Sequence, residues 1–488
     1  MSTTSSTAEP RSSRRWLALG VIAAAQFMVI MDTSIIGVAL PKMQHDLGFT
    51  PEGLSWVFNA YVVAFGGLLL LGGRLSDLYG ARRIFSLGWV ILAAGSLTAG
   101  FAGNVPVELT GRAIQGAGSA LIAPAALTLL FMTFGSSPKE LTRALALYGA
   151  AAPAGGTAGV FLGGLLTQYA SWPWVFFINV PLAAVVLMVT RSVLPAGVTR
   201  RGSLDLASAA TVTAGLAALV YAVVRAPQAG WTSPSTLLVG LGGLMLLGLF
   251  VAMQARLREP LMRLGIFTAP NLAASNAAQF LLGAAWIPMF FFLNLYLQQV
   301  LGLGAFASGA ALLPLTVTIM AGMVGAAPRL IARFGPKAMT VAGLATLAGG
   351  LVWLSFIRPD GSFTVDVLPA SLVAAAGMAM AFIPSLGLAL SAAEPEEGGL
   401  ASGIVSTNYQ VGSALGLAAM TALATAFGAD QGASVVARTD GFSAALLGAA
   451  GIAAAGTVLA WAWLRTPQHA TQAASETTHI GAPERAAS

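Results

Sequence analysis

Two short stretches of sequence decide the fold, because the second repeats the first about half a chain later. The stretch "GRLSDLYGARR" spans Gly73–Arg83, and "PRLIARFGPK" spans Pro328–Lys337. Each contains Arg-Leu, then an aromatic residue followed by glycine, then a basic residue, at a constant offset of 255 positions. Glycine takes positive φ angles without steric cost, so Gly80 and Gly335 suit tight reversals. We therefore expect two related halves, each with one such basic loop.

The chain is far more apolar than a soluble domain. Of its 488 residues, 57% are hydrophobic and 9% are charged, whereas soluble domains carry about 25% charged residues. Fourteen apolar runs have about the length of 20 residues that is needed to cross a hydrocarbon core. Within lipid, only a helix can satisfy all its backbone hydrogen bonds inside a single segment. The sequence thus predicts an all-α polytopic membrane protein. Its expected parts are a disordered cytoplasmic tail at 1–15, six helices over 16–194, two extra helices over 204–254, six helices over 272–464 and a disordered cytoplasmic tail at 466–488.

The positive charges indicate how the helices are oriented. With the N-terminus placed in the cytoplasm, nineteen of the 24 Lys and Arg residues fall in cytoplasmic segments, four fall outside, and Arg112 falls within a helix. This asymmetry follows the positive-inside rule. We expect a multi-pass plasma-membrane protein with both termini in the cytoplasm and the lipid bilayer as its partner. Orientation accounts for the net charge of +6, so neither a nucleic acid nor an obligate protein partner is expected.

The residue types that build enzyme centres are scarce. The chain has no cysteine, and its three histidines lie outside the expected helices, so we expect no disulfide, no metal site and no enzymatic activity. No GxxxxGK[ST] pattern is present, which disfavours ATP as a cofactor. A receptor or scaffold is disfavoured because nearly all loops between the expected helices are short. A transporter of small molecules is the class that remains.

Further motifs follow in order along the chain. They are "MDTSIIGVALP" at 31–41, "RAIQGAG" at 112–118, "WPWVFFINVP" at 172–181 and "YLQQVLG" at 296–302. Together with the loop motif they resemble the major facilitator superfamily, and within it the fourteen-helix drug:proton antiporters of the EmrB/QacA type. The resemblance implies two six-helix bundles with two extra central helices that alternate access to a midplane site. It also implies proton-coupled efflux of lipophilic or amphipathic molecules, as in multidrug or antibiotic export. Arginine far outnumbers lysine, which is typical of a GC-rich bacterial genome.

The resemblance assigns a gating role to the loop motif. Its positions are Gly73, Arg74, Asp77, Gly80, Arg82 and Arg83. We expect Asp77 to latch the cytoplasmic side beside a helix N-terminus, where an anion is favoured; a solvated charge run that only sets topology is the alternative.

Three positions depart from the family pattern. Gly37 replaces an asparagine, Val160 replaces the proline of the fifth-helix antiporter motif, and Pro173 replaces an arginine. Because that proline bears on antiport, Val160 keeps an alternative function open: an exporter or uniporter dedicated to one metabolite.

Asp32 and Arg112 are the candidate proton-coupling residues. Asp32 is the only carboxylate well inside an expected span. It lies about nine residues, or ~13 Å, below Pro41, and Arg112 lies about eight residues, or ~12 Å, below Asn104. A lone charge at the bilayer centre costs at least ~2.5–3.5 kcal/mol, so we expect these two to meet. The functional interpretation is that Asp32 takes up a proton when the contact with Arg112 weakens, and the alternative is a static pair.

Small and polar residues supply two further predictions. Gly155, Gly159 and Gly163 recur every four residues, with Gly164 beside them, which favours close helix packing and a sliding seam between the halves. Scattered polar residues predict a wide, mostly apolar cavity for a lipophilic substrate, with interhelical hydrogen bonding as the alternative. The candidate cavity residues are Trp56, Asn59, Tyr61, Gln115, Asn276, Gln279, Asn294, Ser406 and Gln410.

Overall fold

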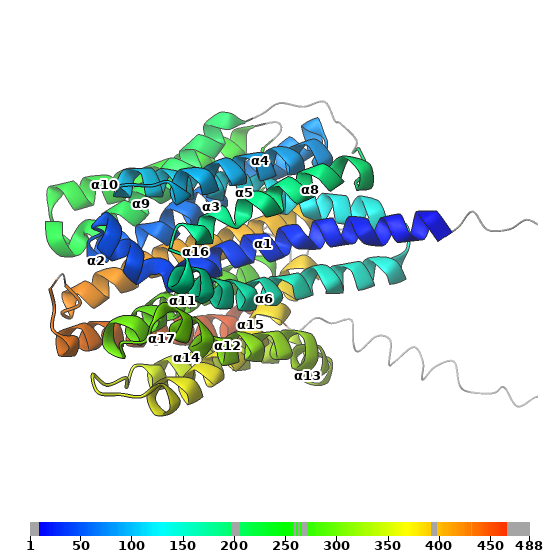
Figure 1. The fold of residues 1–488 in the computed structure, drawn as a ribbon. Coiled ribbons are helices and arrows are strands. Elements are labelled where there is room, and N and C mark those ends of the chain that lie inside the picture. The colour runs from blue at the N-terminus through cyan, green and yellow to red at the C-terminus, as the bar shows by residue number, and fades with distance from the viewer. Residues whose placement is uncertain are drawn as a thin grey trace, which may run out of the picture.

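The described part of the chain is helical, with no strand, and its long helices run roughly side by side (Figure 1). The computed structural model describes residues 9–196, 205–257, 260–261, 264–265, 271–391, 398–430 and 432–465. The N-terminal half contains α1 (Glu9–Leu47), α2 (Pro51–Leu54), α3 (Trp56–Tyr79), α4 (Ala81–Gly100), α5 (Val105–Phe134), α6 (Pro138–Tyr169), α7 (Trp174–Phe177) and α8 (Asn179–Val193). Two extra helices follow, α9 (Leu206–Ala229) and α10 (Pro234–Arg256).

The C-terminal half repeats the six long helices. It contains α11 (Leu272–Leu295) with its π-helical end η2 (Tyr296–Val300), α12 (Ala305–Ala321) continued by η3 (Gly322–Ala326) and α13 (Ala327–Phe334), α14 (Pro336–Leu354), η4 (Phe363–Val367) leading into α15 (Leu368–Ser391), α16 (Gly398–Ala426) and α17 (Val435–Trp463). The packing also repeats: α1 lies on α6 as α11 lies on α16, and α4 lies on α5 as α14 lies on α15. The two halves are therefore parallel copies of one arrangement.

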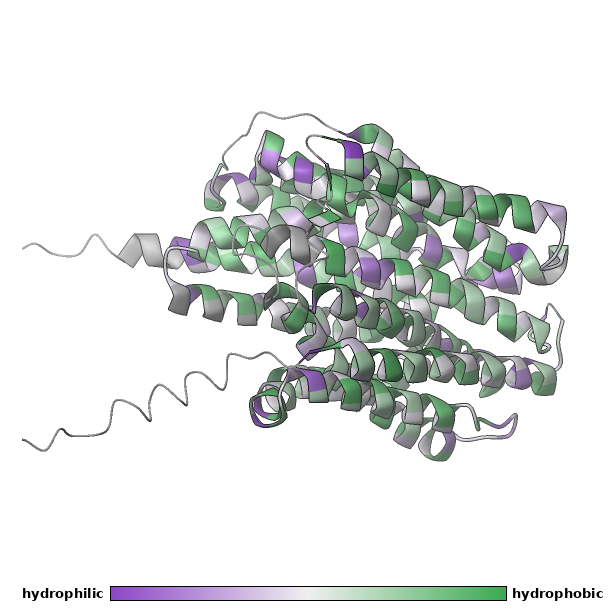
Figure 2. Ribbon diagram, turned by 180° about the vertical axis from the view of Figure 1, so that it is seen from behind, coloured by the Kyte–Doolittle hydropathy of each residue, from purple (hydrophilic) through white to green (hydrophobic). Residues whose placement is uncertain are grey.

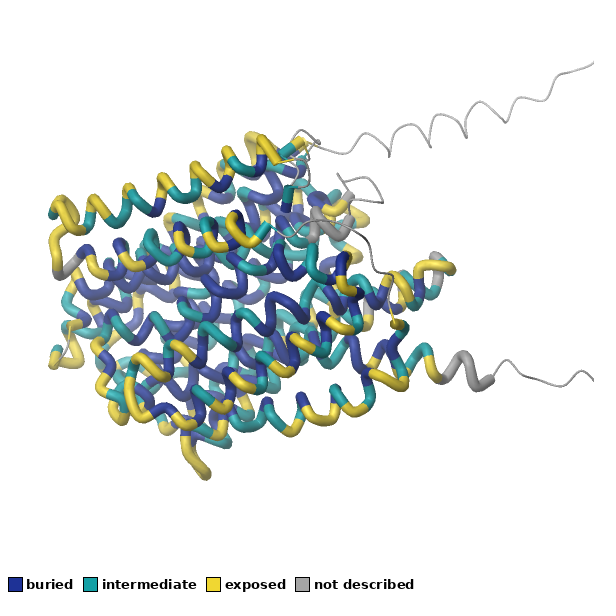
Figure 3. Tube along the Cα trace, turned by 90° about the horizontal axis from the view of Figure 1, so that it is seen from above, coloured by how far each residue is buried: buried dark blue, intermediate teal, exposed yellow. Residues whose placement is uncertain are grey.

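The helices are built to lie in lipid. Thirteen described segments are long and apolar enough to span a membrane. The 29-residue α16 is a fourteenth long helix. Large apolar side chains face outward, among them Leu238, Met245 and Met188, each more than 70% exposed. Figure 2 shows hydrophobic residues along most of the helices, and Figure 3 shows buried residues filling the centre. These features confirm the predicted all-α polytopic fold.

Two sequence-based expectations about segments need correction. Residues 9–15, predicted as disordered, belong to α1, while residues 1–8 and the tail at 466–488 lie outside the described part. The repeated basic stretches are not loops, because Gly80 alone, at φ 91°, separates α3 from α4. Gly335, at φ 81°, does the same between α13 and α14. The expected positive φ is present at both glycines, but the motif residues around them are helical.

Glycines on α6 allow the backbone of α6 to pack directly against the backbone of α1. A Cβ atom added at Gly159 would stand 2.7 Å from the carbonyl oxygen of Met31, one at Gly163 would stand 2.6 Å from that of Ile35, and one at Gly155 would overlap the carbonyl of Phe27. This ladder lies inside the N-terminal half, so the expectation that it forms a seam between the halves is wrong for these three positions.

Gly164 alone among the four faces the other half. A Cβ there would stand 2.8 Å from the carbonyl oxygen of Ala305 on α12. The second half has its own ladder, in which Gly412 and Gly416 of α16 meet the carbonyls of Phe280 and Ala284 on α11. Each half thus has one glycine-mediated contact between its first and fifth long helices.

The ladder yields a stability prediction with a matched control on the same helix. We expect Gly155→Ala to destabilise the protein by ~1–3 kcal/mol, because the added methyl overpacks the contact with α1. Gly149 also lies on α6 but has no atom within 4 Å of an added Cβ. Gly149→Ala should be neutral or stabilising by up to ~1 kcal/mol, since alanine favours helix. Thermal unfolding of the purified variants in detergent measures both; equal melting temperatures would contradict the packing argument.

Candidate functional site

A completely buried ion pair lies within the N-terminal half. Asp32 on α1 and Arg112 on α5 are both 0% exposed, and Arg112 Nη1 donates to Asp32 Oδ2 at 2.7 Å. Counting residues inward from the helix ends places Asp32 and Arg112 at a similar depth in the membrane, and the structure shows that they are in contact. Their role in proton coupling stays a prediction.

Two amides complete the environment of the Asp32 carboxylate. Gln115 Nε2 donates to Asp32 Oδ1 at 3.1 Å, and Asn179 Nδ2 donates to the same oxygen at 2.7 Å. Both amides also donate to Ser96 Oγ on α4, at 2.8 and 3.0 Å. Helices α1, α5 and α8 thus meet at one carboxylate, and α4 joins them through Ser96, which accepts from both amides. Sequence reasoning missed Asn179 and Ser96: Asn179 belongs to the quoted "WPWVFFINVP" motif, but no spacing relates it to Asp32, and Ser96 carries no signal.

The Arg112 guanidinium is held on several sides. Its Nε donates to the carbonyl oxygen of Val57 at 2.9 Å, and Nη1 also donates to Gln115 Oε1 at 2.6 Å. Its Cζ lies 4.6 Å from the ring centroid of Tyr61, a cation–π geometry. Tyr61 in turn donates from its hydroxyl to Ser119 Oγ at 2.8 Å. Nη2 has no hydrogen-bond partner.

Two further carboxylates of the described residues are buried, one in the first turn of α5 and one on the short α2. Glu108 on α5 is 0% exposed, and neither of its carboxylate oxygens has a hydrogen-bond partner. Glu52 on α2 is 5% exposed. Glu108 was missed because it lies at the edge of its apolar run, whereas α5 begins at Val105 and turns this side chain inward.

The gating residues lie at the α3–α4 turn. Gly73, Arg74 and Asp77 are in the last turns of α3, while Arg82 and Arg83 begin α4. Arg82 Nη1 donates to the carbonyl oxygen of Leu194, just past the end of α8, at 3.1 Å. A cation is favoured at a helix C-terminus, so the motif ties this turn to α8. Asp77 and Arg83 are exposed, and a latch at Asp77 stays a prediction.

The candidate cavity residues do not form one wall in this conformation. Gln115 and Tyr61 belong to the ion-pair site. Asn276 Oδ1 accepts from Asn408 on α16 at 3.0 Å, and Gln279 donates to Ser385 on α15 at 2.9 Å. These contacts favour the interhelical hydrogen-bonding alternative for the C-terminal half.

The other candidates are spread along the interfaces between helices. The ring centroid of Trp56 lies 6.5 Å from that of Tyr221 on α9. Ser406 is half-buried on α16, Gln410 packs on Gly66 of α3, and Asn59 is buried with no partner for its amide.

One departure from the family pattern has a steric reason. A Cβ atom at Gly37 would stand 2.9 Å from Asn294 Nδ2 on α11. A larger side chain at this position would displace the Asn294 amide of the other half, so Gly37 and Asn294 fit each other in the observed conformation.

The two halves are closed against each other at the end of the molecule where α1 meets α2. Gln298 Nε2 donates to the carbonyl oxygen of Val38 at 2.9 Å, and Gln299 Nε2 donates to Gln44 Oε1 at 2.9 Å. Phe58 and Phe291 add an edge-on ring contact at 5.9 Å. One buried hydrophobic cluster continues across both halves here, whereas the cluster around Trp89 at the opposite end contains N-terminal residues alone.

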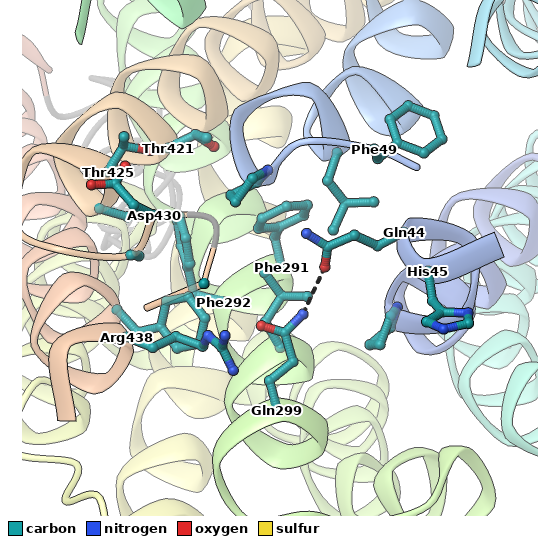
Figure 4. Close-up of a pocket in the computed structure, with 18 of the residues that line it drawn as sticks. Gln44, His45, Phe49, Phe291, Phe292, Gln299, Thr421, Thr425, Asp430 and Arg438 are labelled. Atoms are coloured by element: carbon teal, nitrogen blue, oxygen red, sulfur yellow. Dashed lines mark hydrogen bonds between the residues drawn. The ribbon is translucent and has the colours of Figure 1, made fainter. Parts of the chain in front are cut away.

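A pocket of about 480 Å³ lies beside this closure (Figure 4). It is lined from both halves, by residues that include Gln44, Phe49, Phe291, Gln299 and Arg438. None of the nine candidate cavity residues lines it. In the described part of the chain, no group of three His, Cys, Asp or Glu residues is placed to hold a metal ion.

Comparison with known proteins decides the family. The family model described as Major Facilitator Superfamily matches residues 22–417. The chain belongs to the major facilitator superfamily. It is 35% identical to the puromycin resistance protein pur8 of Streptomyces alboniger, over 95% of this chain and 93% of that protein. It is 36% identical to the cephamycin export protein CmcT of Amycolatopsis lactamdurans, over 84% of this chain and 85% of that protein.

Solved structures support the same fold. A mutant of the nucleoside transporter NupG superposes with a TM-score of 0.63 at 14% identity, covering 92% of this chain and 99% of NupG. The human organic anion transporter MFSD10 gives a TM-score of 0.63 at 17% identity, covering 91% of this chain and 99% of MFSD10. At these identities the likeness concerns the fold alone. Family membership and the apolar helices together make the chain a multi-pass membrane transporter.

Proposed function

We propose that this transporter exports small lipophilic or amphipathic molecules across the plasma membrane, driven by inward proton flow. Export is supported by relatives that include proteins named for puromycin resistance, cephamycin export, and tetracenomycin C resistance and export. The closed end is assigned to the outside and both termini to the cytoplasm, because that orientation puts most basic residues inside.

The buried Asp32–Arg112 pair is the observation that supports proton coupling. The Asp32 carboxylate, bound by an arginine and two amides, holds α1, α5 and α8 together. Protonation removes the charge that Arg112 binds, so it weakens the contact between these helices. Removing one charge of a buried pair costs several kcal/mol, which is enough to shift an equilibrium between two conformations. Inward release of that proton then restores the pair.

The names of the relatives also favour a second candidate, an exporter dedicated to one compound. Several of them carry the name of a single antibiotic. The scattered amides described above have no arrangement that selects one ligand in this conformation.

Transport into inside-out vesicles tests the proposal. The vesicle interior is made acidic, and uptake of ethidium and of puromycin is followed with and without a protonophore. We expect uptake of at least one of them to depend on the pH gradient. Uptake of puromycin alone favours the dedicated exporter, and uptake that is equal with and without the gradient would contradict proton coupling.

A further inference from the structure

Glu108 is a buried acid without hydrogen-bond donors. It lies four residues before Arg112 on α5, about one helical turn or ~6 Å nearer the closed end. Its side chain is 0% exposed, and both carboxylate oxygens lack a partner. Leaving an ionised carboxylate unpaired in such a place is strongly unfavourable. An acid in this position is stable only when it is protonated or when a cation turns toward it.

Arg112 is the cation within reach. Long side chains on a helix lean toward its N-terminus, so we expect the Arg112 guanidinium to reach the turn that contains Glu108. Its Nε and Nη1 are engaged with Val57 and Asp32, but Nη2 has no partner. A buried donor and a buried pair of acceptor oxygens, each unsatisfied, therefore lie one turn apart on one helix.

Among the described residues, no other charge competes for Glu108 at this level. The charged groups that act on it are Arg112 and Asp32. Of the helices packed on α5 here, α3 contributes Tyr61, which stacks on the guanidinium, while α4 and α8 contribute the neutral Ser96 and Asn179. Glu108, Arg112 and Asp32 thus form a triad of two acids and one base.

We propose that Asp32 and Glu108 share Arg112 and one proton, with Glu108 as the proton-binding group on the outer side. This inference rests on the proposed proton coupling. In the observed state Arg112 pairs with ionised Asp32, and Glu108 carries the proton. In the other state the O–H bond of Glu108 is broken and an O–H bond forms on Asp32. Arg112 then turns its Nη2 edge to the Glu108 carboxylate, so the total charge of the triad is unchanged.

In this proton relay from Glu108 to Asp32, proton uptake and proton release take place on opposite sides of the membrane. Glu108 is reprotonated from the outside, and Asp32 releases its proton toward the inside. In both states one carboxylate is paired with Arg112 and the other is neutral, so the net charge of the buried triad is zero in each. A merely structural Glu108 would keep its proton whatever happens to Asp32.

Infrared spectroscopy distinguishes these two roles without transport. The carbonyl stretching band of a protonated carboxylic acid is recorded for purified wild type, Glu108→Gln and Asp32→Asn. We expect the Glu108 band to be lost in Glu108→Gln. It should also be lost in Asp32→Asn, because Arg112 is then free to pair with Glu108 and ionise it. A band that persists in Asp32→Asn would overturn the sharing of Arg112. Glu52→Gln identifies any band that comes from the buried carboxyl of Glu52.

Transport of ethidium tests the relay. We expect Glu108→Gln to lower gradient-driven uptake into vesicles by at least about tenfold. Glu140→Gln is the matched control, because Glu140 is a partly exposed acid paired with Arg15 at the other end of the bundle, and it should transport normally. Full gradient-driven uptake by Glu108→Gln would overturn the relay while leaving proton coupling intact. If wild type shows no gradient dependence, the proposed function fails, and the infrared bands still decide whether the acids share Arg112.

Discussion

Replacing Arg112 by glutamine is expected to destabilise the protein by ~3–5 kcal/mol and to abolish gradient-driven transport. Arg112 is the cation bound to the buried Asp32 carboxylate, and removing one partner of a buried pair leaves the other charge uncompensated. The amides of Gln115 and Asn179 remain as donors, but they supply no charge. Asp32 would then be held neutral, and the step that restores the pair would be lost. Thermal unfolding in detergent and vesicle uptake measure the two effects.

A double variant distinguishes the effect of an unpaired buried charge from the effect of the altered side-chain shape. Asp32→Asn combined with Arg112→Gln removes both charges, so it should recover much of the stability lost in Arg112→Gln alone. Arg83→Gln serves as the control, because Arg83 is exposed at the start of α4, and its melting temperature should match wild type. If Arg112→Gln melts at the wild-type temperature, the pair does not hold the helices together.

Cross-linking the closed end is expected to reduce transport to background. Gln44 and Gln299 lie on opposite halves and are hydrogen-bonded at 2.9 Å. The chain has no cysteine, so Gln44→Cys with Gln299→Cys gives a unique pair for a short bifunctional thiol reagent. Alternating access requires the halves to separate here, and the linked protein cannot do so. Uptake is measured before and after treatment, and a reagent cleavable by reductant should allow recovery.

The matched control links two residues within one half. Arg358 and Asp366 form an ion pair at the same end of the bundle, but both belong to the C-terminal half. Arg358→Cys with Asp366→Cys should cross-link without loss of uptake. Equal inhibition of both pairs would mean that local modification, rather than closure between halves, blocks transport. Continued transport by the fully linked Gln44–Gln299 pair would contradict rocking of the halves.

Depth and periodicity could be predicted from sequence, because each depends on one helix at a time. Counting residues inward from Pro41 and Asn104 places Asp32 and Arg112 at one level, and they are in contact. The repeat at Gly80 and Gly335 predicts two parallel halves, and both glycines have positive φ.

Contacts between helices could not be predicted in the same way. Depth does not give the direction in which a side chain points, so the hydrogen bonds of Asn179 to Asp32 and to Ser96 had no signal in the sequence. The spacing of Gly155 and Gly159 predicts a close approach but not its partner, which is α1 rather than the other half. The candidate cavity stays a prediction for the same reason: polar residues such as Asn276 and Gln279 are hydrogen-bonded to neighbours that only the packing reveals.

Proton movement in sealed proteoliposomes tests the account most directly. A pH-sensitive dye is trapped inside, and ethidium is added to wild type and to Asp32→Asn at equal starting pH. We expect ethidium movement in wild type to drive proton movement in the opposite direction across the bilayer, seen as a pH change inside. In Asp32→Asn we expect no ethidium-dependent pH change, because the amide cannot take up and release a proton beside Arg112. An ethidium-dependent pH change of wild-type size in Asp32→Asn would contradict the claim that this buried pair couples the two fluxes.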